Sequence, residues 1–185
     1  MWSTWPTWDS WNWEGWEGKT SDVEVYSAGK TVKLYLNNQL IGEKPVEQCK
    51  ATFTLNYQPG TLKAESDGAT STLITAGKPA KIAAKADRKS YKADGNDVAF
   101  IDITLTDKLG NPCAMSQDEI TVDVKGGVLL ALGTGDLRDC ANTRDNTHNA
   151  WHGRAQAIVR IPKGAKGVTV TVKGKGLSPT TVKVL

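Results

Sequence analysis

The segment Thr75-Ala76-Gly77-Lys78-Pro79 decides how the rest of the sequence is divided. Short β-rich runs precede it and end at Ile74, and a new run begins directly after it at Ala80. Gly accepts unusual backbone dihedrals and Pro lacks an amide donor, so a strand is not expected to continue unbroken through this segment. The segment is also too short and too unlike a Gly/Ser linker to act as a flexible tether. It therefore predicts a tight junction between two β-domains.

Alternating apolar and polar residues predict several strands on the N-terminal side of this junction. The clearest hairpin joins residues 31–36 to residues 39–42 through Asn37-Asn38, because Asn tolerates the positive φ of such a turn. Turn residues that recur every 8–12 positions or so between short strands are typical of a small antiparallel sandwich. The other strands expected here are at residues 22–26, 51–55, 62–65 and 70–74.

The C-terminal side repeats this pattern over a longer stretch. Phe100, Ile101 and Ile103 interrupt the alternation, as in a strand that is buried on both faces or carries a bulge. No segment combines a helical apolar period with helix caps. The strands expected here are at residues 80–86, 98–106, 119–124, 128–132, 156–161, 167–172 and 180–184.

The sequence thus predicts an all-β chain that contains two tandem antiparallel immunoglobulin-like β-sandwiches. The expected divisions are a Trp-rich leader at residues 1–18, a small first sandwich at residues 19–76 and a larger second sandwich at residues 77–185. A chain of 185 residues has the length of one to two ordinary domains, which agrees with this division.

Composition and charge narrow the range of partners. The chain is 39% hydrophobic and 23% charged, as expected for a soluble globular protein, and its net charge is +3. Because this charge is small and the Lys residues are scattered, we expect no nucleic-acid-binding face. No apolar run approaches the roughly 20 residues of a membrane span, and the N-terminus has no signal-peptide pattern.

The three cysteines cannot all pair within one molecule. The simplest expectation is three unpaired thiols, and the alternative is a bridge between Cys113 and Cys140. Cysteine content therefore does not define a redox compartment.

No residues form a strong catalytic pattern. Asp136 and Asp139 could supply the two carboxylates that glycoside hydrolysis requires, but Asp in Gly- and Asn-rich turns usually accepts hydrogen bonds from backbone amides. The phosphate-binding, nucleophile-elbow and zinc-protease motifs are all missing from the sequence. We therefore expect no catalytic residue and no cofactor in this chain.

Metal binding is also not expected. Cys140, His148 and His152 form a candidate ligand set, but they lack a second Cys at close spacing. Residues 92–97 faintly resemble a calcium loop and lack its alternating ligands, so a β-turn is the better interpretation.

Tryptophan is concentrated in the leader, which contains six of the seven Trp residues of the chain. Each indole offers on the order of 200 Å² of mostly apolar surface, so a segment this short cannot bury them all within itself. The rings are expected to pack on a neighbouring domain, and the alternative is that they stack on the apolar face of a sugar. The candidate contact residues are Trp8, Trp11, Trp13, Trp16 and Glu14.

The first half contains, in this order, the motifs Trp11-Asn12-Trp13-Glu14-Gly15-Trp16-Glu17-Gly18-Lys19, Val23-x-Val25-Tyr26-Ser27, and the runs at residues 32–42, 57–64 and 75–80. This order of motifs resembles the accessory β-domain that follows the catalytic barrel in bacterial β-galactosidases of glycoside hydrolase family 2.

The second half is similar to the immunoglobulin-like (invasin-like) domain that comes next in those enzymes. The motifs are Asp87-Arg88, Ala93-Asp94-Gly95-Asn96-Asp97, Asp107-x-x-Gly110-Asn111, Gly133-x-Gly135-Asp136, and the run at residues 153–160.

The resemblance implies a non-catalytic C-terminal module of a carbohydrate-degrading enzyme. The glutamates that catalyse hydrolysis in the family lie in the barrel, and no position here matches them. The implied partner is the upstream catalytic barrel of the same parent chain, and the implied location is periplasmic or extracellular in a bacterium. One alternative is an autonomous carbohydrate-binding module that uses the Trp-rich face, and another is an adhesion-type tandem. Exposed Trp side chains are also expected to favour a dimer.

Overall fold

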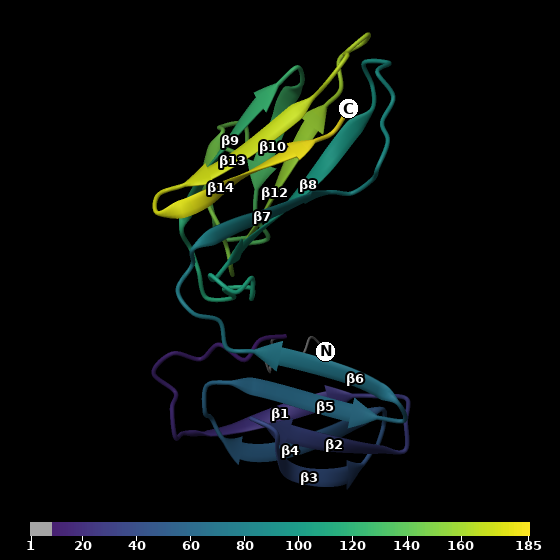
Figure 1. The fold of residues 1–185 in the computed structure, drawn as a ribbon, viewed down its shortest axis with the longest axis vertical. Helices are drawn as coiled ribbons and strands as arrows, with labels where there is room; N and C mark the ends of the chain where they lie inside the picture. The colour runs from purple at the N-terminus through teal and green to yellow at the C-terminus, as the bar shows by residue number, and fades with distance from the viewer. Residues whose placement is uncertain (1–8) are drawn as a thin grey trace. The chain divides into compact units, whose positions relative to one another are not determined.

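The computed structural model describes residues 9–185, so residues 1–8, including the candidate contact residue Trp8, lie outside the described part. The described chain contains strands, turns and loops without a helix, which confirms the all-β prediction. The chain divides into two compact units, the first ending at Thr75 and the second running from Ala76 to Leu185 (Figure 1). Within residues 9–185 no helix is long and apolar enough to cross a membrane.

The first unit consists of a four-stranded sheet in the order β3-β2-β5-β6 and a two-stranded sheet of β1 and β4, all antiparallel. Asn37 and Asn38 adopt φ values of 51° and 66° in the turn between β2 and β3, which confirms the predicted hairpin. The strand bounds are Thr20–Tyr26 (β1), Thr31–Leu36 (β2), Gln39–Pro45 (β3), Lys50–Asn56 (β4), Thr61–Ser66 (β5) and Ala69–Ile74 (β6).

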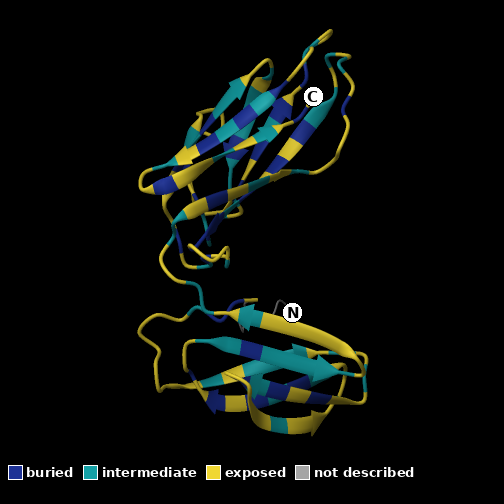
Figure 2. Cartoon of the chain, viewed as in Figure 1, coloured by how far each residue is buried: buried dark blue, intermediate teal, exposed yellow. Residues whose placement is uncertain are grey.

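The core of the first unit follows from the alternation of its strands. Buried and exposed residues alternate along β2 and β4, because successive side chains of a strand point to opposite faces (Figure 2). Trp11 and Tyr57 belong to the same apolar cluster, although neither lies in a strand. The buried side chains contributed by the strands are Val32, Leu34, Leu36, Ala51, Phe53, Leu55 and Leu62.

The second unit contains eight strands in the order β10-β12-β8-β7-β14-β13-β9-β11. All neighbours pair antiparallel except β7 and β14, which meet in parallel only at Lys81 and Ser178. The bounds are Lys81–Ala86 (β7), Val98–Thr106 (β8), Glu119–Lys125 (β9), Val128–Gly133 (β10), Thr147–Asn149 (β11), Arg154–Arg160 (β12), Thr169–Gly174 (β13) and Leu177–Lys183 (β14).

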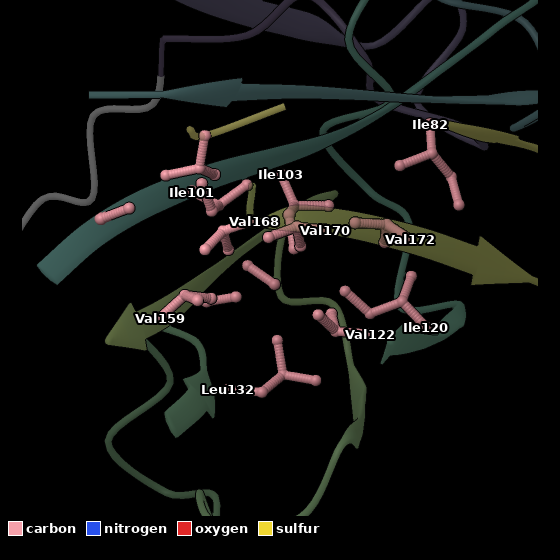
Figure 3. Close-up of a cluster of buried hydrophobic side chains, with 14 of the residues drawn as sticks. Ile82, Ile101, Ile103, Ile120, Val122, Leu132, Val159, Val168, Val170 and Val172 are labelled. Carbon is pink, nitrogen blue, oxygen red and sulfur yellow. The ribbon is translucent and has the colours of Figure 1, made fainter. Parts of the chain in front are cut away.

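Branched aliphatic side chains fill the core of the second unit (Figure 3). Ile101 and Ile103 of β8 lie in one cluster with Val159 of β12 and with Val170 and Val172 of β13, and all five are almost completely buried. Removal of this apolar surface from water is the main driving force for forming the unit.

One expectation for the second unit was wrong, and one strand was not predicted. Strand β8 has no bulge and is not buried on both faces: Ala99, Ile101 and Ile103 are buried, whereas Phe100 and Asp102 are exposed. The alternation of apolar and polar residues in β8 is therefore interrupted only because the aromatic residue Phe100 lies on the exposed face of a regular strand. The strand β11 was not predicted, because three residues are too few to show a period.

A buried carboxylate holds the first residues of the second unit. Asp107 accepts hydrogen bonds from the backbone amides of Gly77 (3.0 Å), Leu109 (2.9 Å) and Asn111 (2.9 Å), and from the side-chain amide of Asn111 (3.0 Å). These hydrogen bonds lower the pKa of Asp107 from about 3.8 to about 2, and the bond from the Gly77 amide has the largest effect. The thiol of Cys113 donates to the carbonyl oxygen of Gly77 at 3.4 Å.

None of the three cysteines is paired in the structure. Cys49 and Cys140 are exposed and Cys113 is buried, so the alternative bridge between Cys113 and Cys140 is not formed.

Candidate functional site

The two aspartates considered as a catalytic pair have separate structural partners. Asp136 accepts hydrogen bonds from the Arg138 guanidinium at 2.9 Å and 3.2 Å, and these contacts lower its pKa. Asp139 accepts a hydrogen bond from the amide of Ala141 at 2.8 Å, and it lies 3.4 Å from the Nε2 atom of His148. Asp136 also accepts the backbone amide of Arg138 at 3.1 Å, so each carboxylate stabilises its own turn in the predicted backbone-capping role.

The candidate metal ligands contact backbone carbonyl oxygens instead, and the Sγ atom of Cys140 lies 3.8 Å from the carbonyl oxygen of Arg138. The Nδ1 atom of His148 lies 2.9 Å from the carbonyl oxygen of Asn149, and that of His152 lies 3.0 Å from the carbonyl oxygen of Ala114. Throughout residues 9–185, no three His, Cys, Asp or Glu side chains are grouped in a way that could hold a metal ion.

Residues 92–97 form a turn held by their own carboxylates. Asp94 accepts the amides of Asn96 (2.8 Å) and Asp97 (2.9 Å), and Asp97 accepts the amide of Lys92 (2.8 Å). The side chain of Asp97 also pairs with Arg88 at 2.8 Å. Residues 94–96 therefore form a bend in which the carboxylate of Asp94 accepts backbone amides.

Trp11 is a core residue of the first unit. Its side chain is only 3% exposed, its Nε1 atom donates to the carbonyl oxygen of Gln58 at 2.9 Å, and its ring meets Tyr57 edge to face at 4.9 Å between centroids. A ring with these contacts offers no surface for a sugar or for another domain. The expectation that Trp11 makes such a contact is corrected accordingly.

Two consecutive turns follow Trp11 and present the next aromatic residues. The amide of Trp16 donates to the carbonyl oxygen of Trp13 at 3.0 Å, and the amide of Lys19 donates to that of Trp16 at 2.9 Å. Gly15 and Gly18 occupy the third position of these turns with φ values of 79° and 77°, where a residue with a side chain would be strained. The sequence Trp-Glu-Gly occurs twice in succession here, and each copy forms one turn.

Tyr57 fixes these turns to the body of the first unit. Its hydroxyl accepts a hydrogen bond from the amide of Trp13 at 3.2 Å. Its carbonyl oxygen accepts the amide of Gly18, and its amide donates to the carbonyl oxygen of Lys19, both at 2.9 Å. The turn segment is thus tied to Tyr57 by one bond to its buried side chain and two bonds to its backbone.

The result is a fixed and exposed aromatic surface, which we call the tryptophan platform and define as Trp13 and Trp16. These side chains are 36% and 46% exposed, and the ammonium group of Lys19 lies 4.4 Å from the centroid of the Trp16 ring. Glu14 is exposed on the same turn. Such a platform can bury its rings against a protein surface or stack on the C–H face of a sugar.

Sequence reasoning identified the platform residues but missed Tyr57, which positions them. Tyr57 is about 40 residues away from the turns in the sequence, and nothing in its local pattern indicates this role. The repeated Trp-Glu-Gly unit was the available signal for the two turns, because Gly is favoured at the third position of a type II turn.

Comparison with known protein families gives two matches along the chain. Residues 82–183 match the glycoside hydrolase family 2 C-terminal domain 5. Residues 18–69 match a domain of unknown function.

Two curated proteins are similar to this chain over most of its length. A β-galactosidase of Bacteroides ovatus is 26% identical over 167 residues, which cover 86% of this chain and 20% of that protein. A β-glucuronidase of Formosa agariphila is 32% identical over 172 residues, which cover 85% of this chain and 17% of that protein. The chain therefore spans about a fifth of the length of these relatives.

Two solved structures are also similar to this chain over nearly its whole length. A glycosyl hydrolase family 2 member from Bacteroides cellulosilyticus matches with a TM-score of 0.90 and 30% identity, over 96% of this chain and 26% of that chain. A β-glycosidase from Bacteroides vulgatus matches with a TM-score of 0.90 and 28% identity, over 95% of this chain and 24% of that chain.

Proposed function

We propose that this chain is a non-catalytic structural and interaction module of a larger glycosidase. The chain belongs to the C-terminal domains of glycoside hydrolase family 2. Its role is to bury apolar surface against the catalytic barrel of the same parent chain and to stabilise that barrel. By analogy with the curated relatives, the parent enzyme hydrolyses a β-galactoside or a related β-glycoside. The same analogy favours a periplasmic or extracellular location in a bacterium.

The tryptophan platform is the observation that supports this role. Trp and Tyr are enriched at the energetic centres of protein interfaces, particularly where rigid rings are presented before binding. Covering the exposed part of Trp13 and Trp16 would remove on the order of 100 Å² per ring from water, or about 2–3 kcal/mol per ring. A platform fixed by Tyr57 loses little conformational freedom when it is covered, so most of this energy is available for docking.

The lack of a catalytic arrangement is consistent with this role. In the described part of the chain, Asp136 and Asp139 are each engaged by a neighbouring group, so neither is positioned as the tuned acid or nucleophile that glycoside hydrolysis requires. We therefore assign hydrolysis to the remainder of the parent enzyme.

Replacement of Trp13 and Trp16 by Ala in the parent glycosidase tests the proposal. The double variant should lower the melting temperature of the catalytic domain, while the module keeps its β-sheet circular dichroism. Leu137→Ala is the matched control, because Leu137 is a 99% exposed apolar side chain far from the platform in the sequence. An unchanged melting temperature in the double variant would contradict the proposal.

A second candidate function is an autonomous carbohydrate-binding module. It is favoured by the pairing of two exposed indoles with the exposed carboxylate of Glu14, which could accept hydrogen bonds from sugar hydroxyls. Titration of the chain with β-galactosides and β-glucuronides, followed by Trp fluorescence, separates the two functions. Saturable quenching that Trp16→Ala abolishes would support the binding module, and a flat response would support the structural role.

A further inference from the structure

Strand β6 forms an edge of the four-stranded sheet in the first unit (Figure 1). Among the described strands it pairs only with β5. Five of its six residues are exposed, because the two-stranded sheet of β1 and β4 is narrower than the sheet it covers (Figure 2). The sequence Ala69-Thr70-Ser71-Thr72-Leu73-Ile74 contains no charged residue and no Pro, and its pairing with β5 shows no bulge.

The other edge strands of the first unit carry features that oppose further pairing. Strand β3 contains Lys44 and Pro45, and its register with β2 shifts. The ammonium group of Lys44 donates to the carbonyl oxygen of Thr52 at 2.6 Å, which occupies an acceptor on β4. Strand β1 carries the carboxylates of Asp22 and Glu24.

The edges of the second unit are protected as well. Strand β10 has a bulge, and the amide of Leu132 donates to the carbonyl oxygen of Thr143 in the loop that follows. Strand β11 is only three residues long. Among the edge strands longer than three residues in the described part of the chain, β6 is therefore the one that has no charged residue, no Pro and no bulge.

The register of β6 shows which of its backbone groups point away from β5. The amide of Thr75 donates to the carbonyl oxygen of Gly60 at 2.9 Å, so Thr75 directs its backbone toward the β5 side. Hydrogen-bonding direction alternates along an antiparallel strand. By this alternation Thr70, Thr72 and Ile74 direct their amide and carbonyl groups to the free edge.

We propose that β6 pairs antiparallel with β6 of a second copy of this chain, in the register that places Thr72 opposite Thr72 across a twofold axis. In this register Thr70 faces Ile74 of the second copy, and all the outward backbone groups of these residues find partners. Two four-stranded sheets then join into one continuous sheet.

A second copy suits this edge because the strand is complementary to itself. An antiparallel pair of identical strands has twofold symmetry, and no like charges meet because β6 has no charges. The facing residues are β-branched, and pairs of such residues stabilise neighbouring strands. Since a single strand pair buries less than the roughly 1,200 Å² of stable complexes, the dimer should be weak and concentration-dependent.

Sedimentation of the purified 185-residue chain over a range of concentrations tests the dimer. The wild type should approach twice its 19.9 kDa mass as concentration rises. Thr72→Lys should remain monomeric, because it places two ammonium groups opposite each other, and circular dichroism should show that it stays folded. Thr72→Val, which keeps the β-branched shape, should dimerise like the wild type.

Cysteine cross-linking tests the register. In a Cys49→Ser, Cys140→Ser background, Thr72→Cys should form a disulfide-linked dimer on mild oxidation, because facing hydrogen-bonded residues lie about 5.5 Å apart between Cα atoms. Thr70→Cys is the matched control: it is equally exposed, but its two copies would lie about 14 Å apart along the strands, so it should not cross-link.

Three results would overturn the proposal. The first is a wild-type chain that stays monomeric over the whole range of concentrations. The second is a dimer that survives Thr72→Lys or is lost only when Trp13 and Trp16 are replaced by Ala, which would place the contact on the tryptophan platform instead. The third is equal cross-linking of Thr70→Cys and Thr72→Cys.

Discussion

The indole Nε1 atom of Trp11 donates a 2.9 Å hydrogen bond to the carbonyl oxygen of Gln58, which lies 47 positions later in the chain. This bond, together with the edge-to-face contact to Tyr57, places the first described Trp in the core of the first unit. Trp13 and Trp16 remain exposed on turns that begin two residues later. The described Trp residues of the leader therefore divide into a buried anchor, Trp11, and an exposed platform, Trp13 and Trp16.

We predict that Trp11→Ala destabilises the first unit by about 3–5 kcal/mol, because it leaves a cavity and an unpaired carbonyl at Gln58. Trp13→Ala should cost less than about 1 kcal/mol, since its ring is already partly in water. Urea unfolding of the full chain, followed by circular dichroism, measures both variants. Equal destabilisation by the two substitutions would contradict the division into anchor and platform.

The carboxylate of Asp107 should make the stability of the second unit sensitive to acid. Its folded pKa is about 2 and its ordinary value is about 3.8. Because the folded pKa is the lower one, the group contributes stability above about pH 4 and loses it as the pH falls toward 2. Melting temperatures between pH 2 and pH 5 should show this loss.

Asp107→Asn is the matched variant for this pH dependence. An amide has only one acceptor oxygen, so its NH₂ group would face either the Gly77 amide and the Asn111 side chain or the backbone amides of Leu109 and Asn111. The variant should be less stable at pH 7 and should lose less stability than the wild type on acidification. A variant with an unchanged acid slope would exclude Asp107 as the source.

The three thiols should differ in reactivity. Burial raises the pKa of Cys113 to about 11, so little thiolate is present at neutral pH, whereas Cys49 and Cys140 are exposed. A colorimetric disulfide reagent should label two thiols quickly in the folded chain and the third only after denaturation. Rapid labelling of all three thiols in folded protein would show that Cys113 is accessible.

Gly153 is expected to tolerate no side chain. Its φ is 68°, and a Cβ atom there would lie 2.3 Å from the backbone carbonyl oxygen of Cys113. Gly153→Ala should therefore cost about 2–4 kcal/mol, from the left-handed backbone and the clash together. Gly164 has a similar φ of 73° and open space around it, so Gly164→Ala should cost only about 1 kcal/mol. Thermal melts compare the two, and equal losses would show that the clash is absent.

The sequence predicted the strands because their periodicity is local. Val32, Leu34 and Leu36 alternate with polar residues, and the structure buries all three. The Asn37-Asn38 turn could be predicted equally well, since Asn is one of the few residues that adopt positive φ readily. The family resemblance stated from the order of motifs is likewise confirmed by the match of residues 82–183.

The roles of the individual Trp residues could not be predicted in the same way. Trp11, Trp13 and Trp16 are chemically identical and closely spaced, and what separates them is their position relative to Tyr57, a partner distant in the sequence. Likewise, β11 exists because Thr147–Asn149 pairs with β9 and not because of any local pattern. Tertiary contacts of this kind leave no periodic signal in the sequence.

The most direct test of the central claim is a hydrolysis assay of the purified 185-residue chain with aryl β-galactoside and aryl β-glucuronide substrates. The parent glycosidase serves as the positive control. A non-catalytic module should release the aryl group no faster than buffer at any pH between 4 and 8. Turnover by the chain alone, reproducible and proportional to its concentration, would contradict the account.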